Sequence, residues 1–219
     1  MFSFEDLPRI IGEIEENWAV KIKEPFPNLS YHFVAPCEGA GGGEPVVKIG
    51  FPGEAENILR EAKMLKFLDG RSVNRLLDFD EKRFAFLLEK LTPGENLKIV
   101  CQSDDLLAVR IAIEVMRAFW RKPPANSGFP RLENWFDGLI QAEKINFAPR
   151  FVSKARRFFE ELNSVREKKT RLLHGDFHHE NILSARRASF LAIDPKGIVG
   201  PVGYDLSVFL INHANWLEG

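Results

Sequence analysis

Cysteines and long apolar runs are scarce in this sequence. Only two cysteines, Cys37 and Cys101, occur in 219 residues. That is too few for a disulfide framework, so we interpret both as free thiols in a reducing compartment. No apolar stretch approaches the roughly 20 residues of a membrane-spanning helix, and the acidic N-terminal segment lacks the basic-then-apolar order of a secretory signal. We therefore expect a cytoplasmic protein with no membrane partner.

An excess of charge of either sign is also missing. Basic residues number 30 and acidic residues 31, for a net charge of −1. This balance argues against a nucleic-acid partner bound through phosphate neutralisation. A G-x-x-x-x-G-K-[ST] motif is absent, which excludes the P-loop class. Apolar residues are plentiful at 45%, with 19 phenylalanines, enough for one large domain or two small lobes around a real core.

The first half of the chain is predicted to be rich in strands. Apolar residues at helical spacing predict an amphipathic helix over about 4–18, and prolines break the pattern at 24–28. A second helix is predicted over 54–68, ended by Asp69-Gly70. The predicted strands cover 29–36, 45–51, 72–79 and 83–90.

The second half is predicted to be mainly helical. The turn-rich connector 91–97 is the candidate boundary. It separates an N-lobe of residues 1–91, which we expect to bind nucleotide, from a helical C-lobe of residues 92–219 that carries the catalytic and metal-binding loops. The predicted C-lobe elements are helices over 103–121, 131–146 and 149–168, a strand over 190–194 and a helix from about 205.

The stretch RLLHGDFHHENIL, residues 171–183, carries the most informative motif. His174, Asp176 and Asn181 form H-x-D-x-x-x-x-N, the spacing of a kinase catalytic loop. In such a loop the aspartate accepts the proton of the acceptor hydroxyl and the asparagine holds Mg²⁺. Asp194 follows at the end of an apolar strand and is the candidate for a second ligand. One carboxylate and one amide suit Mg²⁺, which prefers oxygen ligands and shares them with substrate phosphates.

The first half supplies the other parts of a nucleotide site. Lys48 is the single lysine in the apolar strand PVVKIG, which is similar to the lysine strand of kinases. Its predicted partners are Glu61 on the next helix and the ATP phosphates. The segment FAFLLEKLTPG resembles a last N-lobe strand that runs into a hinge. There the backbone at Glu89 and Leu91 is expected to bind adenine.

These features follow one another in kinase order, which separate coincidences do not explain. The segments LLHGDFHHENIL and LAIDPKGIVGPVGYD resemble the aminoglycoside phosphotransferase branch of the kinase-like fold. More narrowly, IDPKG in place of D-F-G, and the following GYD, are similar to the streptomycin 6-phosphotransferase and hydroxyurea phosphotransferase group. The resemblance runs from about residue 29 to 212 and is densest over 172–206.

The resemblance implies an α+β, two-lobed protein-kinase-like fold with a small antiparallel-sheet N-lobe and a mainly helical C-lobe. It also implies ATP-dependent phosphorylation of a small-molecule hydroxyl, with Mg²⁺ and without nucleic acid, by a monomer or weak dimer. Asp176 is expected to be the catalytic base and Asn181 and Asp194 the metal ligands. Lys48, paired with Glu61, is expected to bind phosphate.

A glycine-rich segment and a histidine cluster suggest binding sites but have simpler interpretations. GAGGG, residues 39–43, fails the G-x-G-x-x-G template and directly precedes the Lys48 strand, so we interpret it as a hairpin turn. A phosphate loop is expected around 27–30 instead. The histidines at 174, 178 and 179 suggest zinc, but the chain lacks the paired cysteines or H-E-x-x-H that would complete such a site. The resemblance gives His174 a role in bracing the loop.

Two further side chains are left with two interpretations each, and a third with one. Asp205 is an N-cap of the last helix or a support of the catalytic loop. Lys196 approaches a phosphate or is a solvated loop lysine. Glu89 is expected to be a surface residue whose backbone matters more than its side chain.

The acceptor remains open at this point. A cationic aminocyclitol such as streptomycin would favour acidic pocket residues, for which Glu133, Asp137 and Glu180 are candidates. Each of them also fits ordinary surface charge. Members of the family continue into further C-terminal helices, so we leave open whether the C-lobe is complete. The alternatives to an active small-molecule kinase are a nucleotide-binding remnant without catalysis and a kinase with a protein acceptor.

Overall fold

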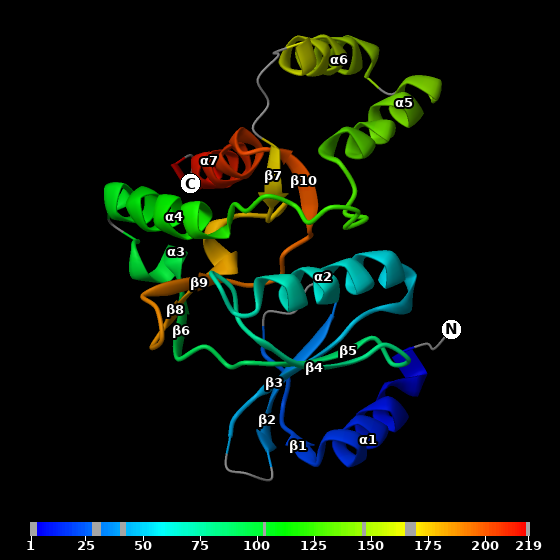
Figure 1. Ribbon diagram of the computed structural model, residues 1–219, viewed down its shortest axis with the longest axis vertical. Coiled ribbons are helices and arrows are strands. Elements are labelled where there is room, and N and C mark those ends of the chain that lie inside the picture. Colours follow the sequence, from blue (N-terminus) through cyan, green and yellow to red (C-terminus); the bar gives the residue numbers. More distant parts are fainter. Residues whose placement is uncertain are drawn as a thin grey trace.

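The computed structural model describes residues 4–27, 32–39, 43–102, 104–145, 148–164 and 170–217. Figure 1 shows an antiparallel sheet with two helices in the first part of the chain and a mainly helical second part. This is the predicted α+β arrangement. Most of the expected phosphate loop, the centre of GAGGG and the side chain of Asp137 lie outside the described residues.

The N-terminal sheet has five strands in the order β1-β2-β3-β5-β4, each antiparallel to its neighbour. The predicted hairpin between the second and third strands is confirmed, since Cys37 N donates to Pro45 O and Gly39 N to Gly43 O. The strands are β1 (Val20–Ile22), β2 (Phe33–Gly39), β3 (Val46–Ile49), β4 (Leu76–Asp80) and β5 (Ala85–Leu88).

Two helices cover opposite faces of this sheet (Figure 1). Helix α1 (Leu7–Trp18) packs on the face that includes Val47, Ile49 and Ala85. Helix α2 (Ala55–Leu68) follows a single turn, η2 (Pro52–Glu54), and packs on the face that includes Phe86 and Leu88. Since side chains alternate along a strand, Lys48 lies between Val47 and Ile49 but points to the opposite face, toward α2. The alternation of β3 thus aims the strand lysine at α2.

The second part of the chain is helical but contains five short strands. The described helices are α3 (Leu97–Val100), α4 (Asp105–Phe119), α5 (Asp137–Lys144), α6 (Pro149–Ser164) and α7 (Gly203–Leu217). Strands β6 (Pro93–Asn96), β8 (Ile182–Ala185) and β9 (Phe190–Ala192) form one sheet, in the order β6-β8-β9, and β7 (Thr170–Leu173) pairs with β10 (Ile198–Pro201). Figure 1 shows α5 and α6 at the end of the molecule farthest from the N-terminal sheet.

The prediction of residues 91–97 as a simple turn-rich connector is wrong in detail. Gly94 does adopt a left-handed φ of 79°, as a turn residue would. The segment nevertheless forms β6 and the start of α3, because Pro93 and Asn96 pair with Ala185 and Leu183 of a strand far along the chain. A domain boundary between 91 and 92 stays a prediction.

Helices α4 and α7 build the apolar base under the catalytic loop. Ala112, Met116 and Phe119 of α4 are buried with Phe209 of α7, and they share a core cluster with Phe177 of the loop. This core extends to Leu65 and Phe86 of the N-terminal part, so one continuous core supports both sides of the site. No helix among the described residues has the length and hydropathy needed to cross a membrane.

Candidate active site

A buried ion pair joins the sheet to α2. Lys48 Nζ lies 2.8 Å from each carboxylate oxygen of Glu61, so the predicted pairing is confirmed. It also lies 3.0 Å from Asp194 Oδ1. Burial favours a lower pKa for Lys48, but the carboxylates of Asp194 and Glu61 outweigh it, and the net pKa is raised. The ammonium therefore stays charged between two carboxylates.

Asp194 lies where the chain leaves β9. Its φ of 57° is left-handed, a conformation that aspartate tolerates better than most residues. Ile193 N donates to Asn181 O at 3.0 Å, which brings Asp194 beside the catalytic loop. Burial raises the pKa of Asp194, but contact with Lys48 more than offsets this and leaves the pKa below its ordinary value. Asp194 is thus an anion that touches both halves of the molecule.

His174 braces the loop from inside the core. Its buried ring contacts Ile193 O through Nε2 at 2.8 Å and accepts a hydrogen bond from Asp176 N at Nδ1, at 3.3 Å. Burial lowers its pKa to about 4, so the ring is neutral near pH 7. Both ring nitrogens are therefore used within the protein. Among the described residues, no three His, Cys, Asp or Glu side chains gather in a way that could hold a metal ion.

Asp205 supports the same loop from the first turn of α7. Its carboxylate accepts hydrogen bonds from His174 N at 3.0 Å, from Gly175 N at 2.9 Å and from Trp120 Nε1 at 3.0 Å. The N-cap interpretation of Asp205 is wrong, because α7 already begins at Gly203. Loop support is the interpretation that these contacts confirm.

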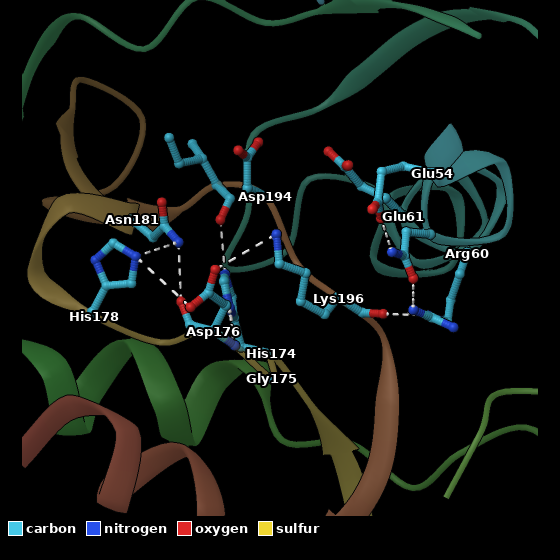
Figure 2. A network of polar contacts seen from close by, with 12 residues as sticks. Glu54, Arg60, Glu61, His174, Gly175, Asp176, His178, Asn181, Asp194 and Lys196 are labelled. Atoms are coloured by element: carbon cyan, nitrogen blue, oxygen red, sulfur yellow. Dashed lines mark hydrogen bonds and ion pairs between the residues drawn. The ribbon is translucent and has the colours of Figure 1, made fainter. Parts of the chain in front are cut away.

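Asp176 and Asn181 are both partly exposed on the catalytic loop. The Asp176 side chain is 39% exposed. Asn181 Nδ2 donates to Asp176 O at 3.0 Å and lies 3.1 Å from His178 Nε2. Figure 2 shows that the amide nitrogen of Asn181 turns toward these partners and its oxygen turns away. The amide oxygen and the Asp194 carboxylate are hard oxygen donors on adjoining segments, a donor set that fits Mg²⁺.

His32 is a site residue that sequence reasoning missed. Its Nδ1 accepts a hydrogen bond from Phe51 N at 3.3 Å. Burial and the nearby charge of Lys48 lower its pKa to about 4, and the charges of Asp194 and Lys196 also act on it. The ring therefore lies within electrostatic reach of Lys48, Asp194 and Lys196. No motif could have revealed this, because its position depends on how β2 returns beside β3.

The hinge segment differs from expectation at one side chain. Glu89 is not a free surface residue, since its carboxylate accepts from Arg75 N at 2.9 Å and pairs with Arg187 at 2.7 Å. Its own amide donates to Arg75 O at 2.9 Å, and Leu91 is buried. Adenine binding by the backbone of Glu89 and Leu91 stays a prediction.

The acidic pocket candidates have local partners. Glu133 pairs with Arg131 at 3.3 Å and Glu180 with Lys98 at 3.3 Å. These contacts fit ordinary surface charge as well as an acceptor pocket, so both residues, like Asp137, remain predictions.

The sequence pattern of the aminoglycoside/hydroxyurea antibiotic resistance kinases matches residues 20–218. The chain belongs to this family. The match covers every described side chain of the site, from His32 and Lys48 to Asp194. Family membership agrees with the resemblance that the catalytic-loop and IDPKG segments indicated.

Individual relatives cover nearly all of this chain. A hydroxyurea phosphotransferase from Kitasatospora aureofaciens is 29% identical over 213 residues, 95% of this chain and 62% of the relative. A streptomycin 6-kinase from Streptomyces griseus is 28% identical over 202 residues, 91% of this chain and 65% of the relative. The chain therefore spans less than two thirds of the length of these relatives.

Solved structures share the fold at low sequence identity. An aminoglycoside-3′-phosphotransferase of type VIII aligns with a TM-score of 0.66 and 17% identity, over 93% of this chain and 82% of the other. The amicoumacin kinase hAmiN, determined with AMP-PNP, Ca²⁺ and Ami, aligns with a TM-score of 0.65 and 14% identity, over 96% of this chain and 72% of the other. The predicted protein-kinase-like fold is thereby confirmed.

Proposed function

We propose that the protein is an ATP-dependent phosphotransferase that moves the γ-phosphate to a hydroxyl group of a small molecule. The observation that carries this proposal is the contact of Lys48 with both Glu61 and Asp194, beside the loop of Asp176 and Asn181. This contact joins the candidate phosphate-binding lysine to the candidate metal ligand Asp194, and the hydrogen bond from Ile193 N to Asn181 O holds that ligand beside the loop of the candidate base. Family membership supports the same reaction class.

The proposed role of each residue follows from its surroundings. The Asp176 side chain is partly exposed and its backbone is held by hydrogen bonds within the loop, so it can orient the acceptor hydroxyl and receive its proton. Lys48 neutralises charge on the phosphates that are not transferred. Asn181 and Asp194 would hold Mg²⁺, which supplies charge neutralisation at the phosphates when bound. The backbone of Glu89 and Leu91 would bind adenine. Catalysis then comes mainly from positioning and electrostatics.

The acceptor we propose is an aminoglycoside such as streptomycin, or a related secondary metabolite. The support comes from the relatives, which are named for streptomycin and hydroxyurea. A cationic acceptor would also suit Glu180, which lies next to the metal ligand Asn181 in the short helical turn η4 (His179–Asn181). Transfer to a protein acceptor, and nucleotide binding without transfer, are the alternatives that the experiment must separate.

The experiment incubates the purified protein with Mg-ATP and a panel of hydroxyurea, streptomycin and several further aminoglycosides, and it follows ADP release and product mass. We expect one panel member to gain a phosphoryl group with wild type and not with Asp176→Asn. A phosphoryl group found on protein and on no panel member would favour the kinase with a protein acceptor, and ATP binding without any product would favour the remnant without catalysis. Failure to bind ATP at all would contradict the assignment of Lys48, Glu61 and Asp194.

A further inference from the structure

The two lysines of the site differ in how many of their N–H donors already contact carboxylates of the protein. Lys48 Nζ contacts Glu61 Oε1, Glu61 Oε2 and Asp194 Oδ1, and its side chain is only 2% exposed. An ammonium has three N–H donors, so these contacts occupy all of them. Lys196 Nζ, by contrast, contacts only one site carboxylate, Asp176 Oδ2 at 3.5 Å, and its side chain is 38% exposed. Lys196 is thus the more available cation beside the candidate base.

The backbone fixes Lys196 from two sides. Lys196 N donates to His174 O at 2.7 Å, and Lys196 O accepts from Arg60 Nε at 2.7 Å. Figure 2 shows the side chain crossing from the Arg60 side of the site toward Asp176. The backbone of Lys196 is therefore held by the catalytic loop and by α2 together.

Two glycines allow this close placement. Gly197 has a left-handed φ of 62°, and the next residue after Lys196 can therefore turn the chain sharply. A Cβ at Gly175 would lie 3.0 Å from the Cβ of Lys196, tighter than most such contacts. The loop thus keeps a residue without a side chain where Lys196 passes.

Charge is the reason that this position matters. Asp176, Asp194 and Glu61 place three carboxylates around the site, and the γ-phosphate of ATP adds further negative charge between them. The charge of Lys196 acts on Asp194 and Glu61 as well as on His32, so its amine lies within electrostatic reach of all three. A phosphate that arrives there meets a cation whose present contact, at 3.5 Å, is long for a hydrogen bond.

We propose that Lys196 binds the γ-phosphate of ATP and stays with the phosphoryl group during transfer. This inference rests on the proposed function and adds a catalytic residue to it. On binding ATP, the amine exchanges Asp176 for a γ-phosphate oxygen, which leaves Asp176 to receive the acceptor hydroxyl. The acceptor oxygen then bonds to the γ-phosphorus, the bond to the ADP oxygen breaks, and the hydroxyl proton passes to Asp176. Lys196 keeps its own proton and offsets the charge of the phosphoryl oxygens.

The test compares a nucleotide that has a γ-phosphate with one that lacks it. Affinities of AMP-PNP and ADP are measured by calorimetry with Mg²⁺ for wild type, Lys196→Gln, Lys196→Arg and Lys21→Gln. Lys21 is a matched surface lysine on β1 that pairs with Glu15. We expect Lys196→Gln to weaken AMP-PNP by about tenfold to a hundredfold, the range of a charge-assisted hydrogen bond. ADP affinity should change much less, Lys196→Arg should recover part of the loss, and Lys21→Gln should match wild type.

The possible outcomes separate this inference from the proposed function. If wild type binds both nucleotides and Lys196→Gln weakens them equally, or weakens neither, Lys196 does not bind the γ-phosphate and the inference fails while the proposed function stands. Wild type that binds no nucleotide overturns both. Thermal unfolding of each variant serves as the folding control, because the contacts that fix Lys196 are made by its backbone.

Discussion

Asp176 carries its side chain on a loop whose backbone is held by other residues. His174 Nδ1 receives the Asp176 amide and Asn181 Nδ2 donates to the Asp176 carbonyl, so neither contact needs the carboxylate. Asp176→Asn should therefore fold normally and bind ATP as wild type does. Its turnover number should fall by about 10²–10⁴-fold, the usual contribution of a general base. Steady-state kinetics and nucleotide titration check this, and a variant with a normal turnover number would exclude Asp176 as the base.

The buried pair of Lys48 and Glu61 predicts that a double variant is more stable than the corresponding single variant. Lys48→Met leaves Glu61 without its cation in the core, and we expect a loss of about 3–5 kcal/mol in unfolding free energy. Lys48→Met combined with Glu61→Leu removes both buried charges and should recover part of that loss, because only Asp194, whose side chain is 36% exposed, is then left without Lys48. Urea denaturation of the two variants measures the difference. A double variant that is no more stable than Lys48→Met would contradict the pairing.

The buried ring of His174 predicts how stability changes with pH. Its pKa is lowered by burial from the ordinary 6.5 to about 4. Above about pH 6.5 the ring is neutral in both states, but as the pH falls toward 4 only the unfolded chain takes up the proton. The folded state should thus lose up to about 3 kcal/mol over this range.

Denaturation at several pH values tests this prediction, with His174→Gln as the variant that cannot titrate. The stability of His174→Gln should fall less steeply between pH 6.5 and 4 than that of wild type. His32, whose pKa is also lowered to about 4, contributes in the same direction, and His32→Gln separates its share. Equal slopes in wild type and both variants would show that neither ring is kept neutral by the fold.

At the scale of single residues, sequence reasoning found the residues that belong to motifs. Lys48, Glu61, Asp176, Asn181 and Asp194 have fixed spacing or fixed order, and the structure brings them together. His32 and Arg187 were missed because their partners lie on segments that only the folded chain brings together.

Among the elements, the turn between β8 and β9 is tied to the hinge by one side chain. Arg187 contacts Glu89 through Nε at 2.7 Å and Nη2 at 2.8 Å, Gly70 O at 2.6 Å and Val73 O at 2.5 Å. The guanidinium thus joins this turn to the end of β5 and to the segment after α2. Its planar fork can satisfy a carboxylate and two carbonyls at once, which an ammonium cannot.

These contacts of Arg187 predict different losses of unfolding free energy for two substitutions. Arg187→Ala should lower the unfolding free energy by about 1.5–3 kcal/mol, the range for hydrogen bonds to charged groups. Arg187→Lys should recover less than half of that loss. A double-mutant cycle with Glu89→Gln measures the coupling between the two side chains. Additive effects would mean that the ion pair does not hold the hinge.

Element prediction succeeded where a segment carries its own pattern. The apolar spacing of α1 and α2 was sufficient, and Asp69 ends α2 in a left-handed conformation as its sequence position predicts. The five strands β1, β6, β7, β8 and β10 were missed. Each has three or four residues, and four of them pair with strands remote in sequence. The equally short β3, β5 and β9 were found because they lie in the longer apolar segments 45–51, 83–90 and 190–194.

On the scale of the whole molecule, the site exists only where the two parts of the chain meet. Lys48 and Glu61 come from the sheet and α2, whereas Asp176, Asn181 and Asp194 come from the later loops. A ligand that spans them should stabilise the folded chain as a unit. With Mg-ATP at a hundred times its dissociation constant, we expect about 2.7 kcal/mol of added stability. Thermal unfolding checks this, and an unchanged melting temperature in saturating Mg-ATP would contradict the shared site.

The central claim is that this chain transfers the γ-phosphate of ATP to a hydroxyl group. The most direct measurement uses ATP that carries ¹⁸O only on the γ-phosphoryl group, with streptomycin or another panel member as acceptor and mass spectrometry of the product. We predict an acceptor that gains a phosphoryl group with the label, formed by wild type and lost in Asp176→Asn. If labelled inorganic phosphate appears and no panel member or protein gains the label, the chain hydrolyses ATP without an acceptor, and the claim is wrong.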